Sequence, residues 1–381
     1  MPMMRTFAAT AHAAVGAAAL LMAPASGAQD VPLDGPRFEE MHPETVTKIA
    51  MGSCHKRDRF NGIWKAIGAD EPDIFLFLGD NIYGDTEDMS VMRERYEMLE
   101  SYADFAEFRE RVPVFATWDD HDFGVNDGGA EYPEREGSQE EFFRFVGEPM
   151  GSWRRDTSGV YDVEYFGPPE RRVQVILLDT RWFRGPLATA PNDGSRAEGV
   201  GGRYVPNRDP SVTMLGEEQW AWLERTLRVP AELRVIASSI QVVAEDHRYE
   251  KWANLPHERS RLMRTIAETG AEGVVFVSGD RHSAELSVLD PARCEPGTGG
   301  DWAQAVGYPL FDFTVSALTN SYGGYSNELN RHRVGSQFHD NNFGTIEIDW
   351  ECDDPSVVFE LHDAEGVVVF RYETTVGGLG R

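Results

Sequence analysis

The sequence predicts an α/β fold, because short apolar runs typical of buried strands alternate with segments of helical periodicity. A second observation is that several of the apolar runs end at side chains that can bind metal. The stretch Phe75–Asp85 shows both features, since its apolar run stops at Gly79 and is followed by Asp80 and Tyr83. Open α/β sheets hold their chemistry at the carboxyl ends of strands. The alternative interpretation is a carboxylate that caps a turn, followed by a half-buried tyrosine.

The same arrangement recurs along the chain, which favours a site over ordinary turn chemistry. Each further buried-looking run is followed by metal-capable or polar side chains. These are Cys54 and His55 after residues 47–53, Asp119, Asp120, His121 and Asp122 after 112–118, Asp179 after 173–178, Gln241 after 234–240, and Asp280 and His282 after 273–279.

The intervening segments predict helices, and the last quarter of the chain predicts strands. Helical periodicity covers residues 61–69, 88–111, 139–146, 215–227 and 257–268. We therefore expect a lead-in over residues 29–46, a single domain over 47–373 that becomes β-rich from about residue 286, and a flexible tail over 374–381.

Residues 1–28 have the composition of a secretory signal. Arg5 precedes an apolar run over residues 7–22, and the small residues 26–28 are suited to cleavage. The run is too short for a membrane span, and no cysteine follows the cleavage position. We expect export by the general secretory route to a periplasmic or secreted location, without a stable membrane anchor.

Composition limits the classes of partner. The chain has 381 residues, of which 41% are hydrophobic and 26% charged, and its formal net charge is −28. Such a charge argues against a nucleic-acid-binding surface, because phosphate backbones are neutralised by Lys and Arg. Acids gathered around bound cations would suit a phosphate-handling enzyme. A surface acidified for solubility is the alternative.

Six motifs run in order from residue 52 to residue 282: Gly52-Ser-Cys54, Leu78-Gly-Asp80-Asn-Ile-Tyr83, Trp118-Asp-Asp120-His121-Asp122, Leu178-Asp-Thr-Arg181, Ser239-Ile-Gln241 and Gly279-Asp280-Arg-His282. Taken together, these motifs resemble the alkaline phosphatase D family of metallophosphatases. The resemblance implies a four-layer α/β/β/α sandwich with a polynuclear metal site at the strand ends.

It also implies roles for individual residues. His121 would be the catalytic histidine, and Arg181 would hold phosphate oxygens, although a structural ion pair with Asp179 is an alternative. The implied metal ligands are Cys54, Asp80, Tyr83, Asp119, Asp120, Asn126, Gln241, Asp280 and His282.

The donor types favour particular metals. Thiolate, phenolate and carboxylate suit ferric iron, whereas carboxylate and amide oxygens suit Ca²⁺ or Mg²⁺. We expect two or more ions, with Fe³⁺ and Ca²⁺ favoured and Zn²⁺ or Mn²⁺ as alternatives.

The expected function is a secreted, metal-dependent phosphoric ester hydrolase that acts on a small-molecule phosphate ester. A phosphodiesterase or phospholipase D-type activity and a secreted metal-dependent carboxylesterase or lactonase are alternatives. A third alternative is a calcium-binding lectin-like or structural protein, in which Ca²⁺ is held by Asp119, Asp120, Asp122 and Asp127. Such a protein would not need Cys54 or His282. The sequence does not indicate monoester or diester preference, natural substrate or oligomeric state.

The three cysteines carry a further expectation for an oxidising compartment. Cys54 lies in the metal motif, where bound cations would keep it as a thiolate. Cys294 and Cys352 lie where a covalent link would restrain a loop. We therefore predict a disulfide between Cys294 and Cys352.

Overall fold

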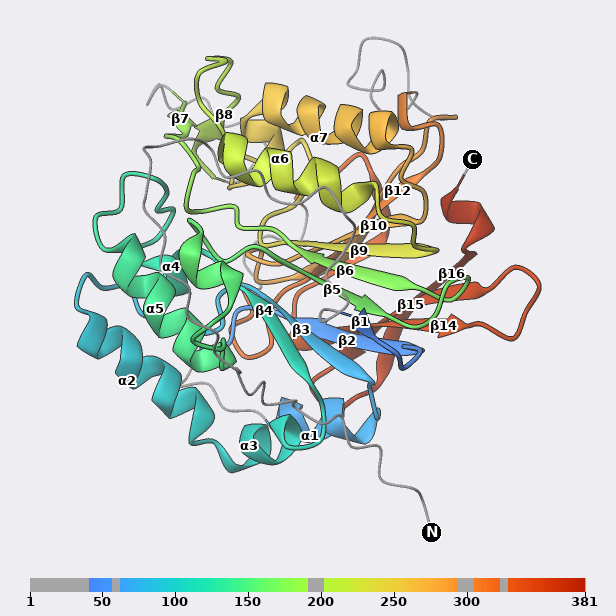
Figure 1. Ribbon diagram of the computed structural model, residues 1–381, viewed down its shortest axis with the longest axis horizontal. Coiled ribbons are helices and arrows are strands. Elements are labelled where there is room, and N and C mark those ends of the chain that lie inside the picture. The colour runs from blue at the N-terminus through green and yellow to red at the C-terminus, as the bar shows by residue number, and fades with distance from the viewer. Residues whose placement is uncertain (1–40, 57–61, 191–201, 293–304, 323–327, 381) are drawn as a thin grey trace, which may run out of the picture.

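The computed structural model describes residues 41–56, 62–190, 202–292, 305–322 and 328–380. Its fold is built on two β-sheets that face each other (Figure 1). Within these residues the larger sheet runs, in spatial order, through β1 (Met41–His42), β5 (Asp162–Phe166), β6 (Val173–Leu177), β9 (Leu233–Ser238), β10 (Val274–Ser278), β12 (Leu310–Val315), β11 (Ala284–Leu289) and β13 (Arg333–Phe338). The smaller sheet runs through β16 (Val368–Thr375), β15 (Ser356–Asp363), β14 (Asn342–Asp349), β2 (Lys48–Gly52), β3 (Ile74–Leu78) and β4 (Val114–Thr117). A short pair, β7 (Ala188–Thr189) with β8 (Tyr204–Val205), lies apart from both.

Helices cover the outer face of each sheet. Those beside the smaller sheet are α1 (Ile63–Ala69), α2 (Met89–Glu100), α3 (Ala103–Arg109) and α5 (Arg135–Val146), and those beside the larger sheet are α6 (Gly216–Leu227) and α7 (Pro256–Thr269) (Figure 1). One-turn α4 (Asp120–Phe123) follows β4 directly. In the described part of the chain, no helix is both long enough and apolar enough to cross a membrane.

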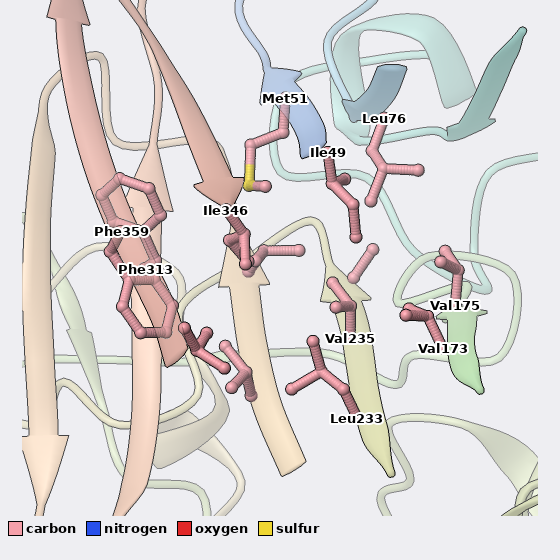
Figure 2. Close-up of a cluster of buried hydrophobic side chains, with 14 of the residues drawn as sticks. Ile49, Met51, Leu76, Val173, Val175, Leu233, Val235, Phe313, Ile346 and Phe359 are labelled. Carbon is pink, nitrogen blue, oxygen red and sulfur yellow. The ribbon is translucent and has the colours of Figure 1, made fainter. Parts of the chain in front are cut away.

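The core forms because strand side chains alternate between the two faces of a sheet. In β3, Leu76 packs between the two sheets, whereas Phe75 and Phe77 pack against the helices. Figure 2 shows the layer between the sheets, where Ile49 and Leu76 of the smaller sheet approach side chains of β6 and β9 in the larger sheet. Strands buried on both faces read as continuous apolar runs, and this is why they were recognisable in the sequence.

Strand direction places the site. β2, β3 and β4 are parallel neighbours in the smaller sheet, and β6, β9, β10 and β12 are parallel neighbours in the larger one. Parallel neighbours bring their carboxyl ends to one edge. The residues that follow these strands can therefore meet, even though they are spread over more than 200 positions of the chain.

Several expected elements have different limits in the structure. The helix expected over residues 88–111 is divided into α2 and α3, because Tyr102 adopts an extended backbone between them. Helix α5 begins at Arg135 rather than at residue 139. Strand β13 was not predicted. The expected flexible tail is instead packed, because β16 continues to Thr375 and Leu379 is fully buried.

Three expectations fall wholly or partly outside the described residues. The signal over residues 1–28 lies outside them, as does the lead-in up to residue 40. The predicted Cys294–Cys352 disulfide is not present, because Cys352 is an exposed free thiol. Cys294 itself lies outside the described residues.

Candidate metal centre

Four of the predicted ligands occupy an unusual backbone conformation. The φ angles of Cys54, Asp80, Asp280 and His282 are 57°, 51°, 66° and 53°, in the left-handed region that few non-glycine residues adopt. All four follow the carboxyl ends of strands. Residues held in such conformations concentrate at functional sites, because the surrounding structure must impose them.

Cys54, Asp80, Tyr83 and His282 form the first part of the centre. The Cys54 thiol lies 3.4 Å from Asp80 Oδ2, and the Tyr83 hydroxyl lies 3.2 Å from the same oxygen. The Tyr83 hydroxyl is also 3.2 Å from His282 Nε2. The structure thus brings together a thiol, a carboxylate, a phenol and an imidazole that the sequence places on three different strand ends.

Carboxylates form the second part. Asp119, Asp120 and Asp280 offer oxygens within 4.8 Å of one another, and so do Asp120, Asp127 and Glu250. Asp80 and Asp120 join the two parts, since both belong to a further set with His121. Shared carboxylates of this kind are suited to bridging neighbouring cations, because each has two oxygens.

Two of these buried oxygens, Asp119 Oδ2 and Asp120 Oδ1, have no hydrogen-bond partner among the described residues. Unpartnered buried polar atoms are costly, and they are explained by an ion or water at the site. The donor set and its orphaned oxygens therefore fit bound cations.

The electrostatics agree with that fit. Burial raises the pKa of the Cys54 thiol to about 11 and the pKa of Asp80 well above its ordinary value. Burial also raises the pKa values of Tyr83 and Asp280 well above their ordinary values. So many acidic groups cannot all ionise side by side unless positive charge is added.

His121 lies over Tyr83, with ring centroids 4.2 Å apart, and its Nδ1 is 2.6 Å from Asp85 Oδ1. Burial alone would lower the pKa of His121, but the charges of Asp80 and Asp120 and the bond to Asp85 raise it to about 11. In the described part of the chain Nε2 has no hydrogen-bond partner. Asp85 was not singled out by sequence reasoning as the partner of this histidine.

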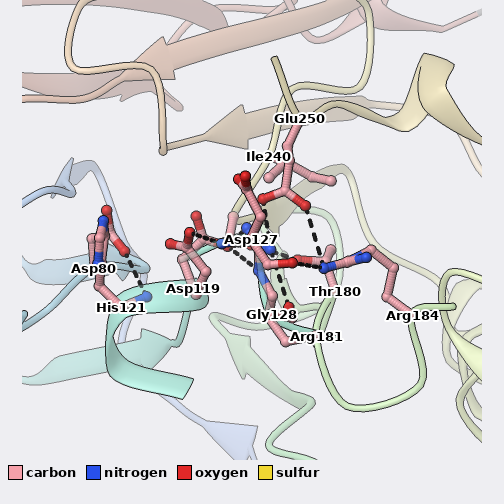
Figure 3. A network of polar contacts seen from close by, with 12 residues as sticks. Asp80, Asp119, His121, Asp127, Gly128, Thr180, Arg181, Arg184, Ile240 and Glu250 are labelled. Atoms are coloured by element: carbon pink, nitrogen blue, oxygen red, sulfur yellow. Dashed lines mark hydrogen bonds and ion pairs between the residues drawn. The ribbon is translucent and has the colours of Figure 1, made fainter. Parts of the chain in front are cut away.

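Arg181, which the resemblance implies as a phosphate-holding residue, is buried among acidic side chains. The guanidinium is fully buried and pairs with Asp119 at 2.5 Å and with Glu250 at 2.7 Å (Figure 3). Arg184 adds a second cation 3.4 Å from Glu250. Two carboxylates already match its charge, and a role for Arg181 in holding phosphate oxygens stays a prediction. The expected ion pair with Asp179 is also absent, since that carboxylate accepts the backbone N–H groups of Val160, Arg181 and Trp182 instead.

Two further predicted ligands, Gln241 and Asn126, carry side-chain amides. Gln241 is buried, and its amide oxygen already accepts from His247 Nε2 at 2.8 Å, while its nitrogen donates to Glu285 and Thr314. Asn126 is exposed and lines a cleft together with Asp120 and Asp127. Their metal-binding roles stay predictions.

The centre opens into a cleft of about 480 Å³. Its acidic wall holds Asp120, Asp127, Glu250 and Asp280 together with both histidines, His121 and His282. The remaining walls hold arginines and aromatic rings, namely Arg203, Arg248, Arg281, Tyr204, Tyr249 and Tyr322. A cleft of this size admits a small organic molecule.

Sequence reasoning missed Asp85 and Glu250 and named Asp127 only for a calcium-binding alternative. These residues come from loops, where no apolar run precedes the carboxylate. For Asp127 a signal does exist: it lies in the Gly-rich segment shortly after His121. Glu250 offers none, since it becomes part of the centre only through tertiary contact with Arg181 and Arg184.

The fold and the site define an α/β protein with a polar, metal-suited centre at the carboxyl ends of strands from two facing sheets. The chain belongs to the PhoD-like phosphatase family, whose pattern it matches over residues 149–353, more than half of its length.

Two individual proteins show the relationship in detail. Alkaline phosphatase D of Bacillus subtilis (strain 168) is 24% identical over 317 residues, which cover 70% of this chain and 50% of that protein. The chain thus spans about half the length of the curated relative it matches. The solved structure of PhoD superimposes with a TM-score of 0.66 at 17% identity, covering 87% of this chain and 69% of that one. This likeness shows the shared fold.

Proposed function

We propose that this chain is a secreted, metal-dependent phosphoric ester hydrolase that acts on small-molecule phosphate esters. The observation that carries the proposal is the set of overlapping ligand groups that share Asp80 and Asp120 at the base of the cleft. Membership of the PhoD-like phosphatase family supports the same chemistry. Export would depend on the signal predicted over residues 1–28.

The residues present indicate which cations each part would hold. Cys54, Asp80, Tyr83 and His282 would hold a ferric ion, because thiolate and phenolate favour it. Asp119, Asp120 and Asp280 would hold a hard cation such as Ca²⁺. When bound, such ions would attract the phosphoryl oxygens and make a water molecule acidic enough to attack at neutral pH.

The protein side chains would supply the remaining functions. Asp85 holds Nδ1 of His121 at 2.6 Å, which orients Nε2 towards the leaving group of an ester in the cleft. A protonated Nε2 would then donate its proton to the departing alcohol. Arg181 keeps the Asp119 carboxylate charged and correctly oriented, without touching the substrate.

The proposal includes the four-layer arrangement that the resemblance implied. Three hydrophobic clusters support it: one between the sheets, and one between each sheet and its helices.

The test combines two measurements on purified protein. Metal analysis should find two or more ions per chain, and hydrolysis of 4-nitrophenyl phosphate and bis(4-nitrophenyl) phosphate should be lost on chelation and restored by metal. The ratio of the two activities then separates monoester from diester preference. A metal-free protein that hydrolyses neither ester, even after metal addition, would contradict the proposal.

A further inference from the structure

A second cavity, of about 510 Å³, lies beside the cleft and belongs to none of the groups described above. Tyr204 and Arg248 line both spaces, so the two are neighbours. The wall between them is built by backbone pairing, because the N–H groups of Arg203 and Tyr204 donate to the carbonyl of Arg248 at 2.8 and 2.7 Å. The segment from Arg248 to Lys251 therefore separates the cavity from the cleft.

Two adjacent residues of this wall, Glu250 and Lys251, have opposite charges and face opposite sides of it. Glu250 faces the metal centre, where it joins Asp120 and Asp127 and pairs with Arg181 (Figure 3). Lys251 lines the second cavity instead. The acidic character of the metal centre thus stops at this wall.

The carboxylates that line the second cavity are already neutralised. Glu245 pairs with Arg259 at 2.9 Å and lies 3.3 Å from His332. Asp246 pairs with Arg331, whose Nε lies 2.9 Å from Oδ1. Neither acid is left to balance the other cations of the lining.

Three cations of the lining have no carboxylate partner within the described ranges: Arg208, Arg248 and Lys251. Lys251 gives the strongest evidence of the three, because the residue is only 3% exposed. Its ammonium donates one long bond, 3.3 Å, to the carbonyl of Tyr249. A buried charge without a counter-ion is costly, so such groups are normally paired.

In a chain with a net charge of −28, an excess of unpaired cations in one cavity is unexpected unless an anion binds there.

We propose that the second cavity is an oxyanion-binding site, in which Lys251 and Arg248 bind a phosphate or carboxylate group. An ammonium supplies a point charge with three donors, and a guanidinium supplies a planar fork that matches two oxygens. The oxyanion is either free in solution or a second anionic group on the leaving part of an ester held in the cleft. The latter source rests on the proposed function, whereas the site itself does not.

The binding test uses the full chain at pH 6 and inorganic phosphate as the calorimetric probe. The Asp80→Asn variant, which weakens the metal centre, should still bind one phosphate. Adding Lys251→Met should weaken that binding at least tenfold, whereas adding Lys65→Met should leave it unchanged. Lys65 is the matched control, because its side chain is 74% exposed and lies on the helix-covered side of the other sheet.

Folding is checked on the same samples. Lys251→Met removes an uncompensated buried charge, so its midpoint of urea unfolding should equal or exceed that of the parent. In the native chain the same substitution should remove one of two phosphate-binding events. Phosphate binding that survives Lys251→Met unchanged, or no phosphate binding to Asp80→Asn, would overturn the site.

A kinetic arm identifies the source of the oxyanion. Each ω-carboxyalkyl phosphate is paired with an alkyl phosphate of equal chain length that lacks the carboxylate, and kcat/KM is measured for both. If kcat/KM for the carboxyalkyl ester exceeds that for its partner about tenfold or more at one chain length, and this ratio falls towards one in Lys251→Met, the site binds a group of the substrate. A ratio near one at every length, with phosphate binding intact, assigns it to a free anion. Absence of all hydrolysis would count against the proposed function and leave the binding result standing.

Discussion

Replacing Arg181 by methionine tests whether this arginine supports the site or binds substrate. Arg181 is fully buried between Asp119 and Glu250, at 2.5 and 2.7 Å. Methionine keeps much of the side-chain volume and removes the charge. Two buried carboxylates would then lose their main counter-ion, although Glu250 keeps Arg184 at 3.4 Å.

The expected cost follows from the burial of the pair. Removing one partner of a buried ion pair costs about 3–5 kcal/mol, because the charge left behind is not compensated. For a domain of this size the cost corresponds to a fall in the thermal midpoint of roughly 4–7 °C. The loss should be measured on metal-free protein, so that bound cations do not replace the missing charge.

The loss should also depend on pH. Burial outweighs the charge of Arg181 and raises the pKa of Asp119 to about 6 and the pKa of Glu250 to about 7. Without Arg181 both pKa values would rise further, so the folded variant binds protons more readily than the folded native chain does. The loss in free energy of unfolding caused by the substitution should therefore reach its full size at pH 8 and be smaller at pH 5, where both carboxyls become neutral.

Urea unfolding of native chain and variant at the two pH values measures this effect. Arg203→Met is the matched control, because Arg203 also pairs with an acid of the centre, Asp127 at 2.7 Å, but its side chain is 63% exposed. Exposed pairs contribute about 1 kcal/mol or less. A variant at Arg181 with native stability and a raised KM for phosphate esters would refute the positioning role and restore substrate binding.

Four further perturbations test other parts of the structure. Asp80→Asn should release metal and lower nitrophenyl phosphate turnover by about 100-fold or more while circular dichroism stays native; full metal content with native turnover would remove Asp80 from the centre. His121→Ala should lower hydrolysis of alkyl phosphates by about 100-fold and spare nitrophenyl esters, whose leaving group needs no proton; equal losses on both would make it a ligand or a structural residue. Burial acts to raise the pKa of Glu245, but its hydrogen bond to His332 and the charge of Arg259 outweigh this and lower the pKa to about 2. The ionised Glu245 carboxylate should add about 1–2 kcal/mol to the free energy of unfolding after allowance for solvent screening, and this contribution should be present above pH 4.5 and lost towards pH 2. In urea unfolding, the free energies of Glu245→Gln and of the native chain should therefore become equal as the pH falls; a difference that does not change with pH contradicts the pairing. Leu379→Ala should cost about 3 kcal/mol in urea unfolding, because Leu379 is fully buried in the core between the sheets; a native-like midpoint would mean that the end of the chain is not packed.

The strands and most of the centre were predictable because their signals are local. A strand buried on both faces must be apolar throughout, and its end is marked where a glycine or acid interrupts the run, as at Gly79 and Asp80. Helix limits were less predictable. Residues 88–111 have continuous helical periodicity, and the break at Tyr102 comes from the packing of Phe105 and Phe108 in the core, to which the local pattern contributes little.

The sequence was therefore sufficient for the α/β class and for the metal-capable side chains that the strand ends bring together, including Cys54, Asp80 and His282. It was not sufficient for the pairing of charges in the interior. Arg181 carries the same local motif whether it binds phosphate or Asp119, and Glu250 has no local motif at all. The energy of a buried charge depends on which groups from distant segments surround it, and those neighbours exist only once the two sheets have packed together.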